Sequence, residues 1–512
     1  MQIIDNKILL LNLRNPNKIT TVIPKSKQIG ENQVAVNWGL DEARVLRNLA
    51  IKNVPSPIIG QYKWEGVYKP FEHQKDTSSF LTLNPRAFCL NEQGTGKTGS
   101  VIWAADYLMK IGRIKRVLVI CPLSIMDSAW RADLFKFAMH RQVDIAYGNK
   151  EKRVRIIRSN TEFIIINYDG VEIVQEEIVA GGFDLIVIDE ANAYKNAQTT
   201  RWKTLNKILK PETWLWMLTG TPAAQSPVDA YGLAKLLNPT GVPRFYSAFK
   251  DMVMYKVSQF RWVVRPNADQ IVFEALQPAI RYTKEECLDL PEQTYVTREV
   301  ELTPQQKKYY ELLRKQLVVS TAGEQITSVN AAVGMSKLLQ ISCGAVYSDS
   351  GETLEFDIKN RYNVLREVID ETKQKILIFV PFKNTIQILH DKLELDGFNT
   401  EIINGDVPHN KRTEIFKNFQ EKPDPRILII QPLAAAHGVT LTAADTIVWW
   451  GPTPNLETYA QANARAHRAG QKHPVTVVKL QGSNAERHIY KMLDNRITDH
   501  VKLVELYKNL LE

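Results

Sequence analysis

The stretch RAFCLNEQGTGKTGSVIWAADYLMK, residues 86–110, decides the fold of this chain. Its first part, 86–90, is a short apolar run that predicts a buried strand, and its last part, 99–110, predicts a helix. Between them lies NEQGTGKT (91–98), a glycine-rich turn of the kind whose backbone N–H groups bind phosphate where a helix begins. A strand, a phosphate loop and a helix in this order predict an α/β fold with a nucleotide site.

Each residue type in this loop suits a chemical task. Glycines permit the turn and the close approach of a phosphate, the lysine reaches the β- and γ-phosphates, and the threonine hydroxyl that follows it ligates Mg²⁺. The strict phosphate-loop pattern begins with Gly, whereas this chain has Asn91. The nucleotide contacts predicted in the loop are Asn91, Gly94, Thr95, Gly96, Lys97 and Thr98.

A second candidate element is FDLIVIDEANAYKN, residues 183–196. Its apolar run ends in Asp189 and Glu190. A carboxylate at the end of a buried strand beside a phosphate loop can hold Mg²⁺ through its water shell, which is the role predicted for Asp189. The neighbouring Glu190 can orient or deprotonate the attacking water. The alternative is a surface Asp-Glu pair at a strand end, which is common.

A third element, QANARAHRAGQ (461–471), carries Arg465 and Arg468, three positions apart. At helical spacing these residues share a face. Two guanidinium groups far along the chain from a phosphate loop indicate arginine fingers, which stabilise charge on a transferring phosphoryl group. An exposed, arginine-rich helix is the alternative interpretation.

Composition sets further bounds on the chain of 512 residues, which is long enough for two or three domains. The 65 Lys and Arg residues exceed the 56 Asp and Glu residues by nine, a basic excess compatible with a polyanionic partner. The N-terminus makes a poor signal peptide and no apolar run reaches about 18 residues, so we expect a cytoplasmic protein without a membrane partner. Four scattered cysteines indicate neither a zinc site nor a disulfide framework: Cys89, Cys121, Cys287 and Cys343.

Short apolar runs alternate with helical patterns in both halves of the chain, as in RVLVIC (116–121) and KILIFV (375–380). Near-continuous apolar strands between helices predict two parallel sheets covered on both faces. The expected organisation is an accessory segment 1–62, a first α/β lobe 63–240, a mostly helical region 241–360 and a second α/β lobe 361–512. In the accessory segment a short strand (8–13) and a helix (40–51) are expected.

Read in order, these motifs resemble those of superfamily-two helicase-type ATPases, and among them the Swi/Snf-type DNA translocases. The resemblance covers about residues 68–490. Within the family, the chain resembles a compact prokaryotic or phage-like member. Three positions depart from the family pattern: Asn192 stands where His is common, Thr440 where Asn is common and Ala464 where Asp is common. The other segments that carry the resemblance are 68–81, 117–137, 218–222, 376–382, 403–412 and 437–445.

The resemblance implies two RecA-like lobes with ATP and Mg²⁺ bound in the cleft between them. Lobe one would hold ATP·Mg through Lys97, Thr98 and Asp189, and lobe two would supply the two arginines when the cleft closes. The resemblance further implies adenine recognition by Gln74 and a nucleotide contact by Gly438. Residues implied to couple the sites are Thr219, Thr221, Thr440 and Gln461. Residues implied to contact DNA phosphates are Ser124, Lys195, Asn404, Gly405, Arg412 and His437.

The function that the resemblance implies is an ATP-dependent motor, acting as a monomer on double-stranded or branched DNA. It would remodel DNA or protein–DNA complexes in replication, recombination or repair. Two alternatives stay open: a strand-separating DNA or RNA helicase, and a non-catalytic nucleic-acid-binding scaffold, against which the intact motifs argue. Residues 1–62 lie outside the motor, so they are the expected place for substrate choice or for a protein partner.

Overall fold

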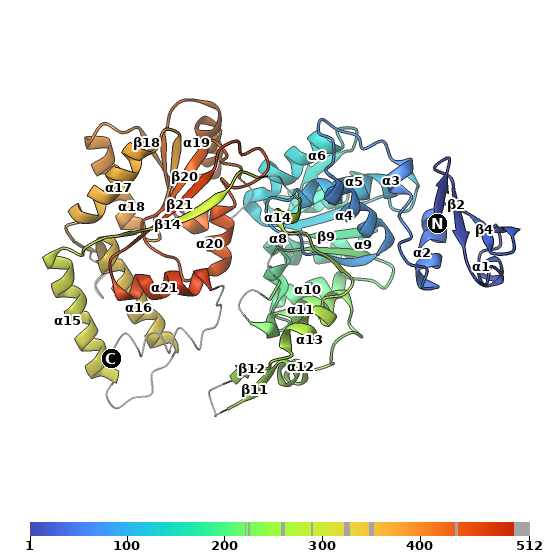
Figure 1. Cartoon of the computed structure of the whole chain (residues 1–512), viewed down its shortest axis with the longest axis horizontal. Helices are drawn as coiled ribbons and strands as arrows, with labels where there is room; N and C mark the ends of the chain where they lie inside the picture. Colours follow the sequence, from blue (N-terminus) through green and yellow to red (C-terminus); the bar gives the residue numbers. More distant parts are fainter. Residues whose placement is uncertain are drawn as a thin grey trace. The chain divides into compact units, whose positions relative to one another are not determined.

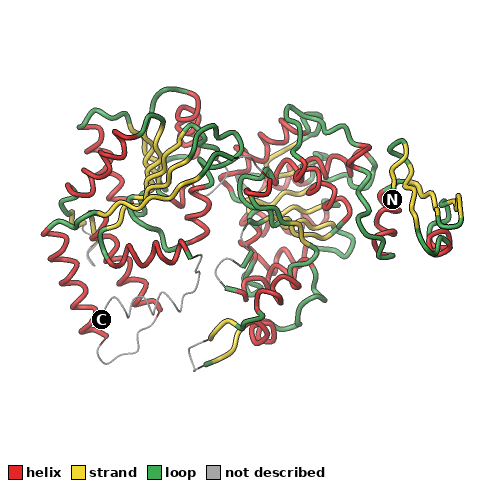
Figure 2. The backbone as a smooth tube through the Cα atoms, viewed as in Figure 1, coloured by secondary structure: helices red, strands yellow, loops and turns green. Residues whose placement is uncertain are grey.

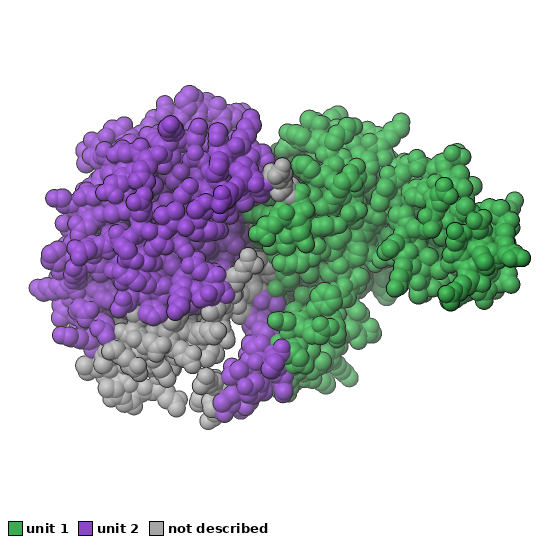
Figure 3. All heavy atoms as spheres, in the orientation of Figure 1, with its two compact units in different colours: residues 1–222, 229–253, 267–287 green, residues 223–228, 254–266, 288–512 purple. Residues whose placement is uncertain are grey.

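The structure of the chain, a computed structural model, describes most of the 512 residues. The described residues are 1–220, 222–223, 226–257, 262–287, 290–321, 328–347, 353–435 and 439–495. They form two compact units, drawn in green and purple in Figure 3. Unit 1 comprises residues 1–222, 229–253 and 267–287, and unit 2 comprises 223–228, 254–266 and 288–512.

The centre of unit 1 is a seven-stranded sheet in the order β13-β5-β10-β9-β6-β8-β7, in which every pair is parallel (Figure 1). Its inner strands are buried along their whole length because helices cover both faces, which explains their continuous apolar sequence. The strands are β5 (Arg86–Cys89), β6 (Val117–Cys121), β7 (Val143–Ile145), β8 (Phe163–Asn167), β9 (Leu185–Ile188), β10 (Trp214–Leu218) and β13 (Ala279–Ile280).

Helices follow most of these strands in sequence, as a parallel sheet requires. Between residues 72 and 287 the helices of unit 1 are α4 (Glu72–Leu83), α5 (Lys97–Lys110), α6 (Ala132–Phe137), α7 (Lys150–Ile157), α8 (Tyr168–Ile173), α9 (Gln175–Ala180), α10 (Thr200–Ile208), α11 (Ala230–Leu237), α12 (Tyr246–Val253), α13 (Ala268–Ala275) and α14 (Lys284–Cys287). The predicted strand 86–90 and helix 99–110 are confirmed as β5 and α5.

The N-terminal residues form a small antiparallel sheet in the order β1-β2-β4-β3. Alternate residues of its two central strands are buried, so one face of the sheet packs on the core and the other faces outward. The predicted strand and helix are confirmed as β2 and α2, but β1, β3 and β4 were not predicted. The elements are β1 (Gln2–Ile4), β2 (Ile8–Asn12), α1 (Asn17–Val22), β3 (Lys27–Gly30), β4 (Gln33–Asn37), α2 (Leu40–Asn48) and α3 (Ile58–Gln61).

A buried carboxylate ties the end of this N-terminal part to the large sheet's covering helices. Asp106, in α5, is fully buried and accepts a 2.5 Å hydrogen bond from the Tyr62 hydroxyl. It also accepts from Arg141 Nε at 2.6 Å and from His140 Nε2 at 2.8 Å. Burial by itself would raise the pKa of Asp106, but the hydrogen bonds from Tyr62 and Arg141 outweigh it and lower that pKa. The carboxylate therefore stays ionised and holds three parts of unit 1 together.

Unit 2 contains a six-stranded sheet in the order β14-β21-β20-β17-β19-β18, again wholly parallel. This confirms the predicted pair of α/β lobes. Residues 279–280 and 293–299, inside the region predicted to be mostly helical, each add a strand to one of the two large sheets. The strands are β14 (Gln293–Glu299), β17 (Lys375–Phe379), β18 (Thr400–Ile403), β19 (Ile427–Ile430), β20 (Ala444–Trp449) and β21 (Val475–Gln481).

The helices of unit 2 and two short hairpins complete the fold (Figure 2). Among the residues that the structure describes, no helix has both the length and the apolar sequence that crossing a membrane requires. The helices are α15 (Pro304–Thr321), α16 (Ser328–Cys343), α17 (Lys359–Glu371), α18 (Lys383–Leu395), α19 (His409–Glu421), α20 (Leu456–Asn463) and α21 (Asn484–Asp494). The hairpins pair β11 (Met254–Lys256) with β12 (Trp262–Val264), and β15 (Ala345–Tyr347) with β16 (Thr353–Glu355).

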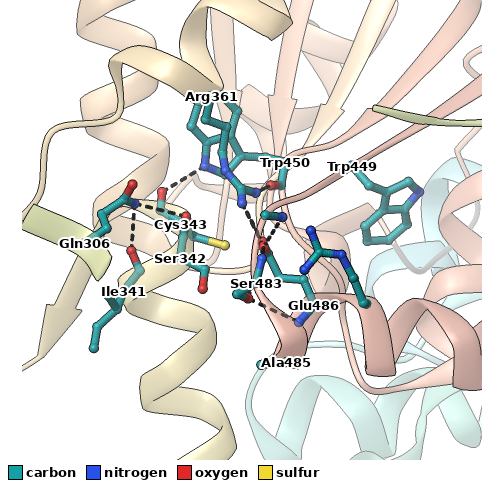
Figure 4. Close-up of polar contacts among 12 residues, drawn as sticks. Gln306, Ile341, Ser342, Cys343, Arg361, Trp449, Trp450, Ser483, Ala485 and Glu486 are labelled. Carbon is teal, nitrogen blue, oxygen red and sulfur yellow. Dashed lines mark hydrogen bonds and ion pairs between the residues drawn. The ribbon is translucent and has the colours of Figure 1, made fainter. Parts of the chain in front are cut away.

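A buried ion pair joins several elements of unit 2 (Figure 4). Arg361 Nη2, in α17, lies 2.7 Å from one carboxylate oxygen of Glu486 and 2.9 Å from the other, and both side chains are at most 2% exposed. Arg361 also donates to the Trp450 carbonyl, and the Trp450 indole donates to the Cys343 carbonyl at 2.9 Å. Burial alone would lower the pKa of Arg361, but Glu486 outweighs it and raises that pKa.

We predict that Glu486→Gln destabilises unit 2 by about 3–5 kcal/mol, because it leaves the Arg361 charge buried without its partner. Glutamine keeps the capping box that Glu486 forms with Ser483 at the start of α21, so the change isolates the charge. Chemical unfolding followed by tryptophan fluorescence measures the effect.

The matched control is Asp396→Asn, which removes one partner of the half-exposed Arg366–Asp396 pair and should change stability little. A double variant, Arg361→Met with Glu486→Leu, removes both charges and should be more stable than Glu486→Gln alone. If Glu486→Gln unfolds at the same denaturant concentration as the parent chain, the ion pair does not hold unit 2 together.

Candidate nucleotide site and nucleic-acid contacts

Neighbouring strand ends of unit 1 bring the predicted nucleotide residues to one edge of the sheet. Strands β5, β10, β9 and β6 are consecutive, and their three pairings are all parallel. The chain leaves them into the phosphate loop, Thr219, Asp189 and the segment of Ser124 respectively. Because ligands of open α/β sheets bind at the carboxyl ends of the strands, this order places the predicted site where the fold favours one.

The phosphate loop has the backbone that its sequence predicts. Gly94 and Gly96 adopt φ values of +88° and +78°, and α5 begins directly afterwards at Lys97. The Lys97 ammonium donates to the Asn91 carbonyl at 2.9 Å and to the Glu92 carbonyl at 3.2 Å. Lys97 therefore closes over its own loop, where phosphate oxygens can replace the two carbonyls as acceptors.

Two side chains of α4 form hydrogen bonds with backbone carbonyls of the phosphate loop. Gln74 accepts a 2.9 Å hydrogen bond from the Phe71 backbone and donates to the Gly96 carbonyl at 3.3 Å. His73 Nε2 donates to the Thr95 carbonyl at 2.8 Å. Gln74 thus contacts the loop directly, whereas its role in adenine recognition stays a prediction. His73 was not predicted, although it precedes the glutamine that the resemblance singled out.

Asn91, the departure from the strict phosphate-loop pattern, has a structural partner on each side. Its amide donates to the Thr77 hydroxyl at 2.9 Å and accepts from the Tyr282 backbone N–H at 3.0 Å. Asn91 is only 1% exposed. Its side chain therefore fixes the start of the loop to α4 and to the segment after β13, and a phosphate contact by this residue would come from its backbone.

Asp189 and Glu190 follow β9 as the sequence predicts. Asp189 accepts a 2.9 Å hydrogen bond from the Trp130 indole and another of 2.9 Å from the Glu190 backbone N–H. Burial raises the pKa of Asp189, and the Lys97 ammonium and the Trp130 indole only partly offset that rise. The Tyr168 hydroxyl, which was not predicted, donates to the Asp189 carbonyl at 2.6 Å. Glu190 has φ +48°, a left-handed conformation that turns the chain at this point.

The donor set of this edge suits Mg²⁺. A carboxylate offers about four lone-pair sites, and the two hydrogen bonds to Asp189 leave the others available. Magnesium is usually held by one or two carboxylates together with waters and phosphate oxygens, so Asp189 and the Thr98 hydroxyl would be sufficient protein ligands. When bound, the ion would neutralise charge on the β- and γ-phosphates.

The arginine element of unit 2 is not the helix that the sequence predicts. Helix α20 ends at Asn463, so Arg465 and Arg468 lie in the turns that follow it. The cause is the buried Gln471, whose amide donates to the Thr442, Ala444 and Ala466 carbonyls and so holds the chain in a turn against β20.

The two arginines nevertheless come together. Arg465 Nη1 donates to the Val439 carbonyl at 3.4 Å, and Arg468 Nη1 donates to the same oxygen at 3.3 Å. Arg465 is 6% exposed, and its own carbonyl accepts from the Leu441 N–H at 2.9 Å. Ala464 offers no carboxylate, and the Val439 carbonyl oxygen is an acceptor that both guanidinium groups share.

The remaining predicted residues occupy varied settings. Thr219 is buried, and its backbone N–H donates to the Cys89 carbonyl at 3.1 Å, while Gln461 is buried in α20. Thr440 is exposed. Thr221, His437 and Gly438 lie outside the described residues.

The predicted DNA contacts are spread over both units. Lys195 forms a 3.1 Å ion pair with Asp229, and the backbone carbonyl of Ser124 accepts from the Ser128 hydroxyl. Arg412 donates to the Gly405 carbonyl at 3.0 Å, and Asn404 accepts from the Asp406 N–H at the same distance, so these residues form one structured loop after β18. DNA binding by these residues stays a prediction.

Comparison with known protein families shows which family models match this chain. A family model of the SNF2-related domain matches residues 82–344, half of the chain, and one of the helicase conserved C-terminal domain matches 360–470. The chain belongs to the SNF2-related family. The match confirms the Swi/Snf resemblance of the sequence and indicates an ATPase of the helicase type. The predicted site residues 91–98 and 189–190 fall within the first matched range, and 465–468 fall within the second.

Individual relatives agree with this assignment. A chromodomain-helicase-DNA-binding protein 1-like of Danio rerio is 27% identical over 439 residues, which cover 80% of this chain and 41% of that protein. An uncharacterized ATP-dependent helicase of Mycoplasma genitalium is 26% identical over 426 residues, 80% of this chain and 39% of that protein. The chain thus spans about two fifths of the length of these curated relatives.

Among solved structures, the Sulfolobus solfataricus SWI2/SNF2 ATPase core in complex with double-stranded DNA is similar at 23% identity and a TM-score of 0.42, covering 84% of this chain and 92% of that one.

We predict that Gly96→Ala lowers nucleotide affinity at least tenfold. An alanine Cβ at position 96 would lie 2.1 Å from Gln74 Nε2, so Gln74 would have to release the loop carbonyls that it holds. Fluorescent ATP-analogue binding measures the change.

Gly112→Ala is the matched control, because Gly112 has a similar φ of +71° but no atom within 4 Å of an added Cβ. Both variants place an alanine at a positive φ, but only Gly96→Ala brings a Cβ against Gln74. Equal affinities for the two variants would show that Gln74 does not support the loop.

We predict that Trp130→Phe shifts the acidic limb of the pH profile of ATP·Mg binding to higher pH. Asp189 must be ionised to hold the metal, its pKa is already raised by burial, and the lost indole hydrogen bond is one that lowers this pKa. Affinity measured from pH 5 to pH 8 should therefore fall at a higher pH in the variant, while the two proteins agree at the alkaline end. A uniform loss at every pH would mean that Trp130 acts only by packing.

Proposed function

We propose that this chain is an ATP-driven motor that moves on double-stranded DNA. The observation that carries the proposal is the pair of site halves: Lys97 beside Asp189 and Glu190 in unit 1, and two arginines aligned on one carbonyl in unit 2. A scaffold without catalysis would have no need of either half. The proposal is supported by relatives named as ATP-dependent helicases and by an SNF2 core whose structure was determined with double-stranded DNA.

In the proposed reaction each residue has one task. Lys97 leaves its loop carbonyls to bind the β- and γ-phosphates, while Thr98 and Asp189 hold Mg²⁺. Glu190 orients the attacking water and accepts its proton. Arg465 and Arg468 stabilise the charge that develops on the transferred phosphoryl group. Such arginines contribute about 10³- to 10⁵-fold in rate.

Because the arginines and the phosphate loop belong to different units, hydrolysis would be coupled to the approach of one unit to the other. A motor that steps in this way must hold DNA through contacts that do not depend on sequence, and phosphates provide such contacts. The candidate contacts to DNA phosphates are the residues predicted above: Ser124, Lys195, Asn404, Gly405, Arg412 and His437. Residues 1–62 are the proposed place for substrate choice or a protein partner, because they contribute no residue to the nucleotide site.

Strand separation with the same core is the second candidate function. Forked duplex unwinding and triplex displacement distinguish the two, since a duplex translocase displaces a third strand without separating the duplex. Unwinding without triplex displacement would favour the strand-separating helicase.

We predict that duplex DNA stimulates ATP hydrolysis, that Lys97→Ala abolishes turnover while retaining DNA binding, and that Arg468→Ala lowers kcat by about 10³-fold or more. Steady-state phosphate release with and without a blunt duplex measures the stimulation and the two losses of turnover, and fluorescence anisotropy of a labelled duplex measures the retained binding.

Arg487→Ala is the control for the arginine variant, because Arg487 is an exposed arginine of unit 2 that pairs with Glu299 away from the site. It should turn over ATP at the parent rate. Turnover by Lys97→Ala at the parent rate would overturn the site assignment, and a parent chain that duplex DNA does not stimulate would overturn the proposed function.

A further inference from the structure

The hairpin of β11 and β12, which we call the ribbon (254–257 and 262–266), has no assigned role. It follows α12 and precedes α13 in the chain, and it joins neither large sheet (Figure 2). An isolated two-stranded hairpin is at best marginally stable in water. Because pairing of the two strands alone stabilises the ribbon so little, we ask what its side chains could bind.

The chemistry of the segment is basic and aromatic. Residues 254–266 read MYKVSQFRWVVRP, with three cations, three aromatic residues and no Asp or Glu, although the chain holds 56 acidic residues. Of these, Lys256, Arg265, Tyr255 and Trp262 are in the described ribbon. Cations interleaved with aromatic rings, without carboxylates, complement a nucleic acid and are poorly suited to a protein partner that carries a basic surface.

The register of the ribbon sorts these residues onto two faces. Met254 opposes Val264 and Lys256 opposes Trp262 on one face, which the buried Met254 anchors, while Tyr255 opposes Val263 on the other face. Val257 directly follows β11, and Arg265 directly follows β12. Tyr255 is 43% exposed and Val257 is 54% exposed. The Tyr255 face of the ribbon thus presents a partly exposed aromatic ring.

Arg265 fixes the orientation of that ring. Its guanidinium carbon lies 5.7 Å from the centroid of the Tyr255 ring, and its Nε donates to the Met254 carbonyl at 3.3 Å. The ring is therefore supported from one side by a cation that is itself held by the backbone. A preorganised, partly exposed ring next to positive charge is the arrangement on which unpaired bases stack, while cations nearby attract the phosphates.

We propose that the ribbon is an accessory binding site for unpaired DNA, in which Tyr255 stacks on an exposed base, while Arg265 beside it and the exposed Lys256 of the opposite face attract the strand's phosphates. The proposal rests on the proposed DNA motor, and it adds a preference for DNA in which bases are unpaired, such as a fork or a gap. Stacking does not depend on base identity, so the site gives a preference for DNA structure and none for sequence.

The test compares Tyr255→Ala with the full parent chain by fluorescence anisotropy on a labelled fork with unpaired arms and on a blunt duplex of the same length. Tyr255→Ala should weaken fork binding by roughly 5- to 100-fold, which is the loss of about one base stack. Blunt-duplex affinity should stay within about twofold. Lys256→Ala should lower the slope of log affinity against log salt on the fork by about one.

Tyr347→Ala is the matched control, because Tyr347 is a 39% exposed tyrosine in the other two-stranded hairpin of unit 2. It should leave fork affinity unchanged. Unchanged thermal unfolding of both tyrosine variants excludes a folding defect.

Two outcomes would overturn the proposal: equal weakening on fork and blunt duplex, which would indicate a duplex contact, or no weakening on either, which would leave the ribbon to a protein partner. Blunt-duplex stimulation of ATP hydrolysis separates this result from the proposed function. If the duplex stimulates Tyr255→Ala and the parent chain equally, the motor stands whether or not the ribbon binds unpaired DNA.

Discussion

The parallel pairing of β5, β10, β9 and β6 is the constraint on which the unit-1 site depends. Strands that run side by side in the same direction end at the same edge, so residues more than a hundred positions apart in sequence become neighbours. The phosphate loop, Thr219 and Asp189 reach one edge in this way, and no local interaction among them would suffice. The continuous burial of the strands then explains why the site cannot shift without disturbing the core.

The second constraint is that the polar groups beneath this edge are satisfied by fixed partners. Asn91 bonds to Thr77 and Tyr282, and Gln74 bonds to Phe71 and the loop. These bonds hold the loop in shape before any phosphate arrives, so binding need not order it. Lys97 differs because its acceptors are backbone carbonyls, which form weaker hydrogen bonds with an ammonium than phosphate oxygens do. Asn91 and Gln74 therefore keep fixed partners that hold the loop backbone. The Lys97 ammonium instead has two carbonyl acceptors that phosphate oxygens could replace.

Much of the fold could be predicted because unbroken apolar runs such as 117–121 and 375–379 are characteristic of strands buried on both faces. Strands at sheet edges gave no such signal. Residues 293–299 alternate between half-buried and exposed, and they become β14 only because β21 lies beside them. Residues 2–4 are all exposed, and they are a strand only through pairing with β2. Such pairings join distant segments, which local sequence patterns do not record.

The candidate site shows the same division between local and distant causes. The glycines of the phosphate loop make its backbone conformation predictable from the sequence, because positive φ values favour glycine. Supporting residues such as His73, Trp130 and Tyr168 carry no motif, and only the fold reveals that they contact the loop or Asp189. The arginine turn was misread as a helix because Gln471, which bends the chain, acts through carbonyls about five to thirty residues away.

Arg465 and Arg468 both donate to the Val439 carbonyl, which links the two guanidinium groups to the loop before β20. Val439 directly precedes Thr440, so a displacement of this loop moves the acceptor that aligns both guanidinium groups. A carboxylate at position 464 would instead aim Arg465 from within its own turn, independently of the loop. With Ala464, the position of the loop before β20 and the direction of both arginines change together. A contact made by that loop can therefore change the direction of both guanidinium groups.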